Sequence, residues 1–89
     1  MKKMKDNKGN ILHIGDRVRI LAIPDLTGMT AAALAETLPV FKHALGTYRR
    51  ISAFSRDGLI EIKLRIKEPT GWQSHFIFIE PNLVSKPRK

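Results

Sequence analysis

The chain has 89 residues, a formal net charge of +8, 43% hydrophobic residues and no cysteine. Its length allows one domain with one modest core, and its apolar content argues against global disorder. The lack of cysteine excludes a disulfide framework, a thiolate metal site and a thiol nucleophile, and it suits a reducing cytoplasm. No apolar run approaches the roughly 20 residues of a membrane span, and no signal peptide is recognisable. We therefore predict a cytoplasmic globular domain.

The positive charge is concentrated near both ends of the sequence. Seven of the sixteen Lys and Arg residues lie in 1–8 and 86–89, whereas 9–85 has nine Lys and Arg against seven Asp and Glu. We predict a disordered basic arm over 1–9, a single domain over 10–85 and a basic tail over 86–89. Such tails attract polyanions without sequence preference, or they simply keep a small protein soluble.

The first half of the domain combines a strand pattern with a helical pattern. Residues 11–23 have the character of a strand, and Thr30 is a typical N-cap for the alanine-rich segment that follows. We predict a helical insert over 30–45. Because Pro39 cannot donate a backbone hydrogen bond, the pattern favours a short helix over 31–37 and a new turn after it.

The second half is dominated by alternating apolar and charged residues. Segments 47–54 and 59–67 form the arms of a predicted hairpin around Asp57-Gly58, and the second arm has four apolar residues on one side: Ile60, Ile62, Leu64 and Ile66. Segment 72–80 is another strand pattern. Since both of its sides are largely apolar near its end, it is predicted to be a central strand. Phe54, Phe76 and Phe78 suit the core, while Phe76 also joins Trp72 in a set of aromatic residues among basic ones.

These elements predict a mainly β fold, a small antiparallel barrel of about five strands. Gly15-Asp16-Arg17-Val18-Arg19-Ile20 resembles the GDxVxI opening of SH3-like barrels, and residues 45–51 resemble their second strand. Residues 79–84 are similar to the strand, proline, 3-10 turn and last strand that close such barrels. The resemblance implies an SH3-like barrel of a bacterial type, in which the helical insert replaces the first loop. The acidic-aromatic stretch of peptide-binding SH3 domains is absent, which argues against polyproline recognition.

The sequence contains no recognisable catalytic or metal-binding motif. The three histidines, His13, His43 and His75, lack the close ligand spacing of zinc sites, so we predict no metal or cofactor. There is no nucleophile elbow and no phosphate-binding glycine loop, so we predict that the protein is not an enzyme. An enzyme would need a pocket that joins His75 to Glu61 or Glu80.

The remaining candidate is a contact face of basic and aromatic residues: Tyr48, Arg49, Arg50, Lys63, Arg65 and Trp72. Small barrels bind single-stranded nucleic acid through aromatic rings among positive charges. The hypothesis is a non-enzymatic binding module that contacts nucleic acid through this face and the lysine-rich tails. The same residues also fit a plain core with a solvated strand face. The alternative is a protein-interaction or accessory-subunit module whose helical insert meets a partner through Leu34, Val40 and Phe41; the insert also fits a plug for the barrel.

Overall fold

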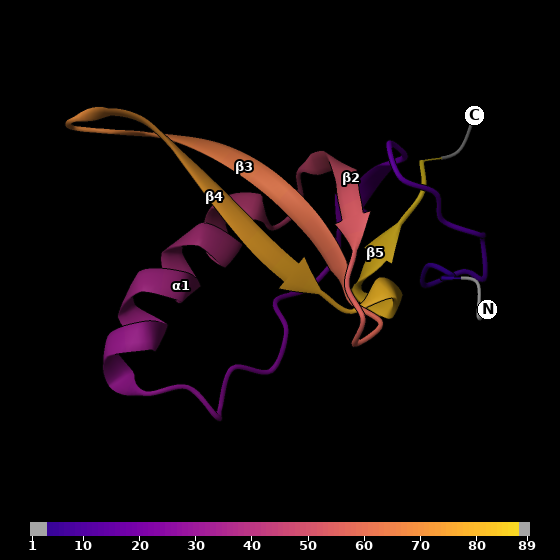
Figure 1. Ribbon diagram of the computed structural model, residues 1–89, viewed down its shortest axis with the longest axis horizontal. Coiled ribbons are helices and arrows are strands. Elements are labelled where there is room, and N and C mark those ends of the chain that lie inside the picture. The colour runs from indigo at the N-terminus through magenta and orange to yellow at the C-terminus, as the bar shows by residue number, and fades with distance from the viewer. Residues whose placement is uncertain (1–3, 88–89) are drawn as a thin grey trace.

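The computed structural model describes residues 4–87, which form one antiparallel sheet of five strands and one α-helix. In chain order the elements are β1 (Arg17–Ile20), α1 (Ala31–Ala44), β2 (Tyr48–Phe54), β3 (Ile60–Glu68), β4 (Gly71–Ile79), the 3-10 turn η1 (Pro81–Leu83) and β5 (Val84–Ser85). The strand order is β4-β3-β2-β1-β5 (Figure 1). The predicted mainly β class is confirmed. Within residues 4–87, β4 and β5 are the two edges and do not pair, so the sheet is not closed.

The β3–β4 hairpin is the longest part of the sheet and projects beyond the other strands (Figure 1). Its pairing runs without interruption from Ile60↔Ile79 to Glu68↔Gly71. The predicted alternation in β3 is confirmed: Ile60, Ile62 and Leu64 are fully buried. On its β3 side, strand β2 pairs only with Ile60, Glu61 and Ile62, the first residues of β3. The outer half of β3 therefore has β4 as its one strand partner.

Two local features bend the chain at β2. The register of β2 against β3 shifts between Ile51 and Ala53, which is a bulge that increases the local bend and twist. The following turn is closed by Ser55, whose Oγ accepts a hydrogen bond from the Leu59 backbone N–H at 3.1 Å. Gly58 has a φ of +80°, a conformation that favours glycine. The turn predicted around Asp57-Gly58 is confirmed.

Helix α1 lies beneath the β3–β4 hairpin (Figure 1). Thr30 caps it as predicted, since its Oγ1 accepts a hydrogen bond from the Ala33 backbone N–H at 3.2 Å. The predicted break was wrong, because α1 continues through Pro39 to Ala44. Val40, Phe41 and Ala44 follow the proline and are buried. This packing stabilises the last turns and offsets the hydrogen bond that Pro39 cannot make.

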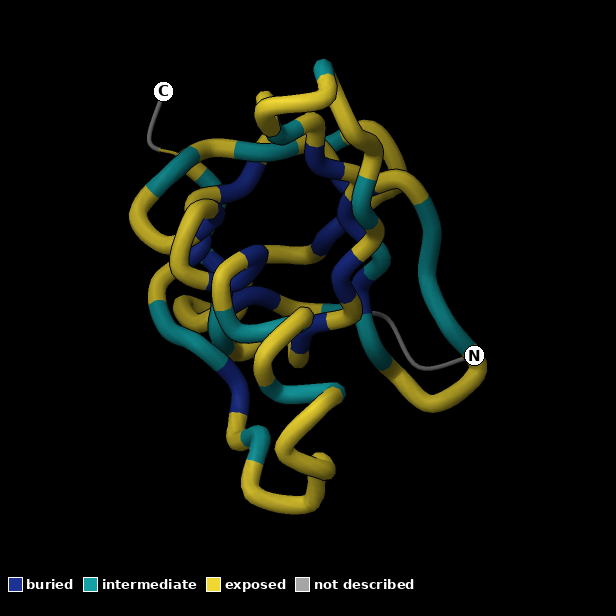
Figure 2. Tube along the Cα trace, turned by 90° about the vertical axis from the view of Figure 1, so that its left-hand side faces the viewer, coloured by how far each residue is buried: buried dark blue, intermediate teal, exposed yellow. Residues whose placement is uncertain are grey.

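The buried residues line one interior, while the turns and much of α1 are exposed (Figure 2). The core residues are Leu12, Val18, Ile20, Val40, Phe41, Ala44, Ile51, Ile60, Ile62, Leu64, Ile77, Ile79 and Val84. Two predictions about β4 were wrong. The strand is an edge and not central. Phe76 and Phe78 point away from the core because they share a face with the charged side chains of β3.

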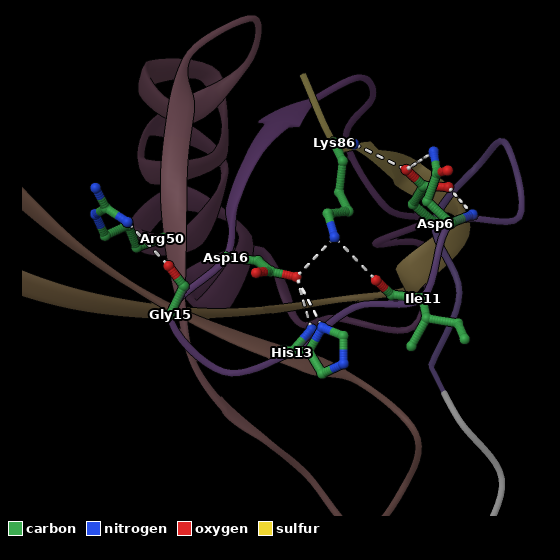
Figure 3. Close-up of polar contacts among 8 residues, drawn as sticks. Asp6, Ile11, His13, Gly15, Asp16, Arg50 and Lys86 are labelled. Atoms are coloured by element: carbon green, nitrogen blue, oxygen red, sulfur yellow. Dashed lines mark hydrogen bonds and ion pairs between the residues drawn. The ribbon is translucent and has the colours of Figure 1, made fainter. Parts of the chain in front are cut away.

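The N-terminal segment is tied to the C-terminal end of the domain. Asp6 is only 5% exposed, and its carboxylate accepts hydrogen bonds from the backbone N–H groups of Lys8 and Asn10. It also accepts one from the backbone N–H of Lys86 (Figure 3). The backbone of Lys5 also pairs with that of Ile11 in an isolated antiparallel β-bridge. Residues 4–9, which lie within the predicted arm, thus make backbone and carboxylate hydrogen bonds to the rest of the domain. Residues 1–3 and 88–89 of the predicted tails lie outside the described part.

Strand β1 is shorter than the predicted strand over 11–23, because the chain turns before Arg17 and leaves the sheet after Ile20. The end of the domain follows the sequence pattern. Pro81 begins η1, and the short strand β5 then pairs with β1 through Ile20↔Val84. The first strand therefore lies between β2 and the last strand.

Candidate nucleic-acid interface

The outer face of the β3–β4 hairpin combines exposed aromatic rings with positive charges. Trp72, Phe76 and Phe78 on β4 are 59%, 56% and 47% exposed. On β3 the adjacent side chains of the same face are basic and exposed. We call this surface the aromatic-basic strip, and it consists of Lys63, Arg65, Lys67, Trp72, Phe76 and Phe78.

The strip follows directly from period-2 alternation and the register of the hairpin. Residues paired across two antiparallel strands point to the same face. Lys63 is paired with Phe76, and Lys67 with Trp72. Because the opposite side chains of β3 fill the core, the charged side must face solvent, and β4 places its aromatic rings on that same side. Glu61, paired with Phe78, is the acidic residue at the inner end of this face.

Two of the three cations, Lys63 and Arg65, lie close to rings of the strip. The Nζ of Lys63 is 6.0 Å from the centroid of the Phe76 ring, and the guanidinium carbon of Arg65 is 5.5 Å from the centroid of the Trp72 ring. These are cation–π distances. Such contacts hold the charges beside the rings, so one bound group meets an apolar surface and a positive charge together.

The predicted contact residues fall into three groups. Lys63, Arg65 and Trp72 come together in the strip. Tyr48 and Arg50 lie on the outer face of β2 beside the arginines of β1, and their register partners are Arg19 and Arg17. Arg49 lies on the opposite face from these two. It is paired with buried Val18, and its Nε donates a hydrogen bond to the Thr47 hydroxyl at 3.0 Å.

The predicted contact face does not include Lys67, Phe76 or Phe78, all of which belong to the strip. From sequence, Phe76 fits either the aromatic-basic set or the core, and Phe78 fits the core. The signal that locates them is the short Pro69-Thr70 connection, which sets the hairpin register and places the even-numbered residues of β4 opposite the charged residues of β3.

The β1–β2 side carries a second outward group. The guanidinium carbon of Arg17 lies 4.6 Å from the centroid of the Tyr48 ring, and Arg50 donates a hydrogen bond from Nη1 to the Gly15 carbonyl at 3.0 Å. Arg19 is exposed beside them. This group shares no residue with the aromatic-basic strip.

Two of the three histidines, His43 and His75, line the same hollow of the surface, together with Glu36 and Glu68. The Nε2 of His75 is 3.6 Å from a carboxylate oxygen of Glu68, and His75 faces a cleft of ≈ 480 Å³ between α1 and the hairpin. Glu61 lies on the opposite face of the hairpin from His75. Within residues 4–87, no three His, Asp or Glu side chains gather in a way that could hold a metal ion.

The apolar residues of the helical insert are mostly used within the domain. Val40 and Phe41, two of the three residues predicted to meet a partner, are buried, and Leu34 is half-buried. Val40 and Phe41 belong to the core. Exposed aromatic surface is found instead on the strip and at Tyr48.

In the described part of the chain, no helix is long and apolar enough to cross a membrane. Comparison with family models, with curated proteins and with solved structures finds no match for this chain.

Proposed function

We propose that this protein is an SH3-like barrel with a helical insert that acts as a non-enzymatic binding module for single-stranded nucleic acid. The barrel assignment is supported by the GDRVRI segment at the first strand and by the path from η1 into β5 beside β1. The sheet of five strands encloses one core, and the bulge in β2 bends it. Both features suit this assignment.

The observation that carries the nucleic-acid proposal is the aromatic-basic strip. Three aromatic side chains that are about half exposed lie on one strand, and three cations lie on the next. Exposed rings of this kind stack on bases of any sequence, and the adjacent Lys and Arg side chains attract the phosphates. A projecting two-stranded hairpin leaves the face accessible to an extended strand (Figure 1). The expected binding is therefore sensitive to salt and tolerant of sequence.

The test is a fluorescence-anisotropy titration of labelled single-stranded RNA and DNA with the full chain at low and physiological salt. Trp72→Ala and Phe76→Ala each remove one stacking platform. Stacking on an aromatic side chain is worth about 1–3 kcal/mol per base, so each variant is expected to weaken binding by about fivefold or more. Arg65→Gln removes one phosphate contact and is expected to reduce the slope of log affinity against log salt by about 1.

Two matched controls separate the strip from general effects of charge and apolar surface. Leu45→Ala removes an exposed apolar side chain next to α1, and Arg56→Gln removes an exposed charge in the β2–β3 turn. Neither is expected to change affinity beyond the small loss that one fewer positive charge causes. If Trp72→Ala and Phe76→Ala bind as tightly as the wild type, the strip is not a nucleic-acid site and its exposed rings point to a protein partner.

A further inference from the structure

A second hollow lies across the outer face of β1. It is a groove of ≈ 250 Å³ between Tyr48 of β2 on one side and the segments near the two chain ends on the other. We call it the terminal groove, and its chief lining residues are Lys8, Arg19, Tyr48, Ser85 and Lys86. It shares no residue with the aromatic-basic strip.

The lining of the terminal groove is strongly positive. Three of its residues are basic, and none of its described lining residues is acidic. Lys86 is held in place, since its Nζ lies 3.2 Å from Asp16 Oδ2 and donates a hydrogen bond to the Ile11 carbonyl at 3.1 Å (Figure 3). Among residues 4–87, Lys8 and Arg19 form no ion pair. Their charges thus remain to attract an anion.

Tyr48 gives the groove a flat apolar wall. Its side chain is 43% exposed, and it is paired across the strands with Arg19. The Arg17 guanidinium lies against the ring, which restricts its orientation. A planar group that stacks on Tyr48 therefore comes close to the guanidinium of Arg19.

We propose that the terminal groove binds a phosphate group joined to a planar ring, the chemistry of a nucleotide. Arg19 has the planar donor fork that matches phosphate oxygens, Lys8 adds a point charge, and Tyr48 stacks on the base. At ≈ 250 Å³ the groove lies just below the roughly 300–1,000 Å³ typical of small-ligand sites, so we limit the proposal to a single nucleotide. This site is independent of the strip.

The experiment is a titration of the ¹⁵N-labelled full chain with AMP, adenosine and inorganic phosphate, followed by amide shifts. AMP is expected to give saturable shifts at Lys8, Arg19, Tyr48 and Ser85, and to bind at least about fivefold tighter than adenosine or phosphate alone. Arg19→Gln and Tyr48→Leu are each expected to weaken AMP binding by about fivefold or more. Arg56→Gln, which removes a charge far from the groove in the chain, is expected to leave AMP binding unchanged.

Three outcomes would overturn the proposal: shifts that do not saturate, adenosine or phosphate binding as tightly as AMP, or an affinity for AMP that Arg19→Gln does not change. Tyr48→Phe guards against misfolding of Tyr48→Leu, because it keeps the ring and is expected to bind AMP normally; loss of binding in Tyr48→Phe counts against stacking. Amide dispersion checks the fold of each variant.

A further pair of titrations identifies the source of the nucleotide. A short oligonucleotide with and without a 5′ phosphate is compared in the Trp72→Ala background, which removes a platform of the strip. If the 5′ phosphate raises the affinity for the oligonucleotide and Arg19→Gln abolishes the increase, the groove binds the 5′ end of a nucleic-acid strand. If the phosphate has no effect while AMP still binds, the groove takes a free nucleotide. Neither result decides whether the aromatic-basic strip binds single-stranded nucleic acid, which the titrations of Trp72→Ala and Phe76→Ala test.

Discussion

A single buried carboxylate, that of Asp6, joins the two ends of the domain. It accepts hydrogen bonds from the backbone N–H groups of Lys8 at 2.9 Å, Asn10 at 2.8 Å and Lys86 at 2.8 Å. Burial by itself raises the pKa of Asp6, but these hydrogen bonds outweigh that effect and lower the pKa from its ordinary value of 3.8. The ionised form is therefore the one that stabilises the fold.

Asp6→Asn is expected to lower the free energy of unfolding by about 1–3 kcal/mol at pH 7, because an amide carries no charge and one side of it meets the N–H donors with another donor. Urea denaturation measures this loss. Asp57→Asn is the control, since Asp57 is exposed in the β2–β3 turn, and it is expected to change stability by no more than about 0.5 kcal/mol. Equal stability of the Asp6→Asn variant and the wild type would show that the carboxylate is dispensable.

The lowered pKa of Asp6 determines how the free energy of unfolding should depend on pH. Asp16 also has a lowered pKa: burial raises it, but hydrogen bonds from the His13 backbone N–H and the Lys86 side chain outweigh that effect. A lowered pKa in the folded state contributes stability that is present above the ordinary value and lost as the pH falls through the folded value. The free energy of unfolding should therefore begin to fall as the pH approaches 3.8 from above, and fall less steeply in Asp6→Asn. Identical pH profiles of the two chains would contradict this account.

At the level of elements, α1 tolerates a proline in its interior. Pro39 is exposed, it lacks the N–H that would bond to the Ala35 carbonyl, and the buried part of the helix follows it. Pro39→Ala should restore that hydrogen bond and raise the free energy of unfolding by about 1–2 kcal/mol, which is less than the full cost of a helix proline because proline also restricts the unfolded chain. Denaturation by urea checks this. Lys42→Ala, a substitution at an exposed position of the same helix, is the control and should change the free energy of unfolding by about 0.5 kcal/mol or less. If Pro39→Ala instead lowers the free energy of unfolding, the proline is needed for packing.

The hairpins and the last strand were predictable from sequence because their signals are local. Alternation in β3 identifies its buried face, and Asp57-Gly58 and Pro81 mark the ends of strands. The site was predictable only in part. The strand patterns suffice to predict Lys63, Arg65 and Trp72 as neighbours. Alternation argues against Arg49, because it places Arg49 on the opposite face of β2 from Tyr48.

The other differences arise from long-range contacts. Which face of β4 is buried and which is exposed depends on its partner strand and on its position at the edge of the sheet. The sequence of the segment itself specifies neither of these. In the sequence, Asp6 is a single acidic residue among lysines, and nothing near it indicates burial. Its buried position depends on Lys86 at the other end of the chain. Pro39 ends helices by local rules, and only the burial of Phe41 after it reverses that preference.

For the whole molecule, the N-terminal segment has a structural role beside its charge. A chain without residues 1–9 loses the carboxylate of Asp6 and the packing of Met4 against the core. We expect its midpoint of urea denaturation to fall at least as far as that of Asp6→Asn. The double variant Lys5→Gln/Lys8→Gln removes two exposed charges and should keep its stability within about 0.5 kcal/mol of the wild type. If the shortened chain is as stable as the full one, the arm contributes charge alone.

The open edge of β4 has a consequence for the behaviour of concentrated solutions. Its segment, GWQSHFIFI, contains no Asp, Glu, Lys, Arg or Pro, the residues that usually prevent an edge strand from pairing with another molecule. Protection against such assembly comes from the cations of neighbouring β3 and from the net charge of +8, which make molecules repel one another. Salt screens this repulsion over a distance of about 10 Å at 0.1 M. Colloidal stability should therefore decrease as ionic strength rises, with aggregates growing by strand addition along β4.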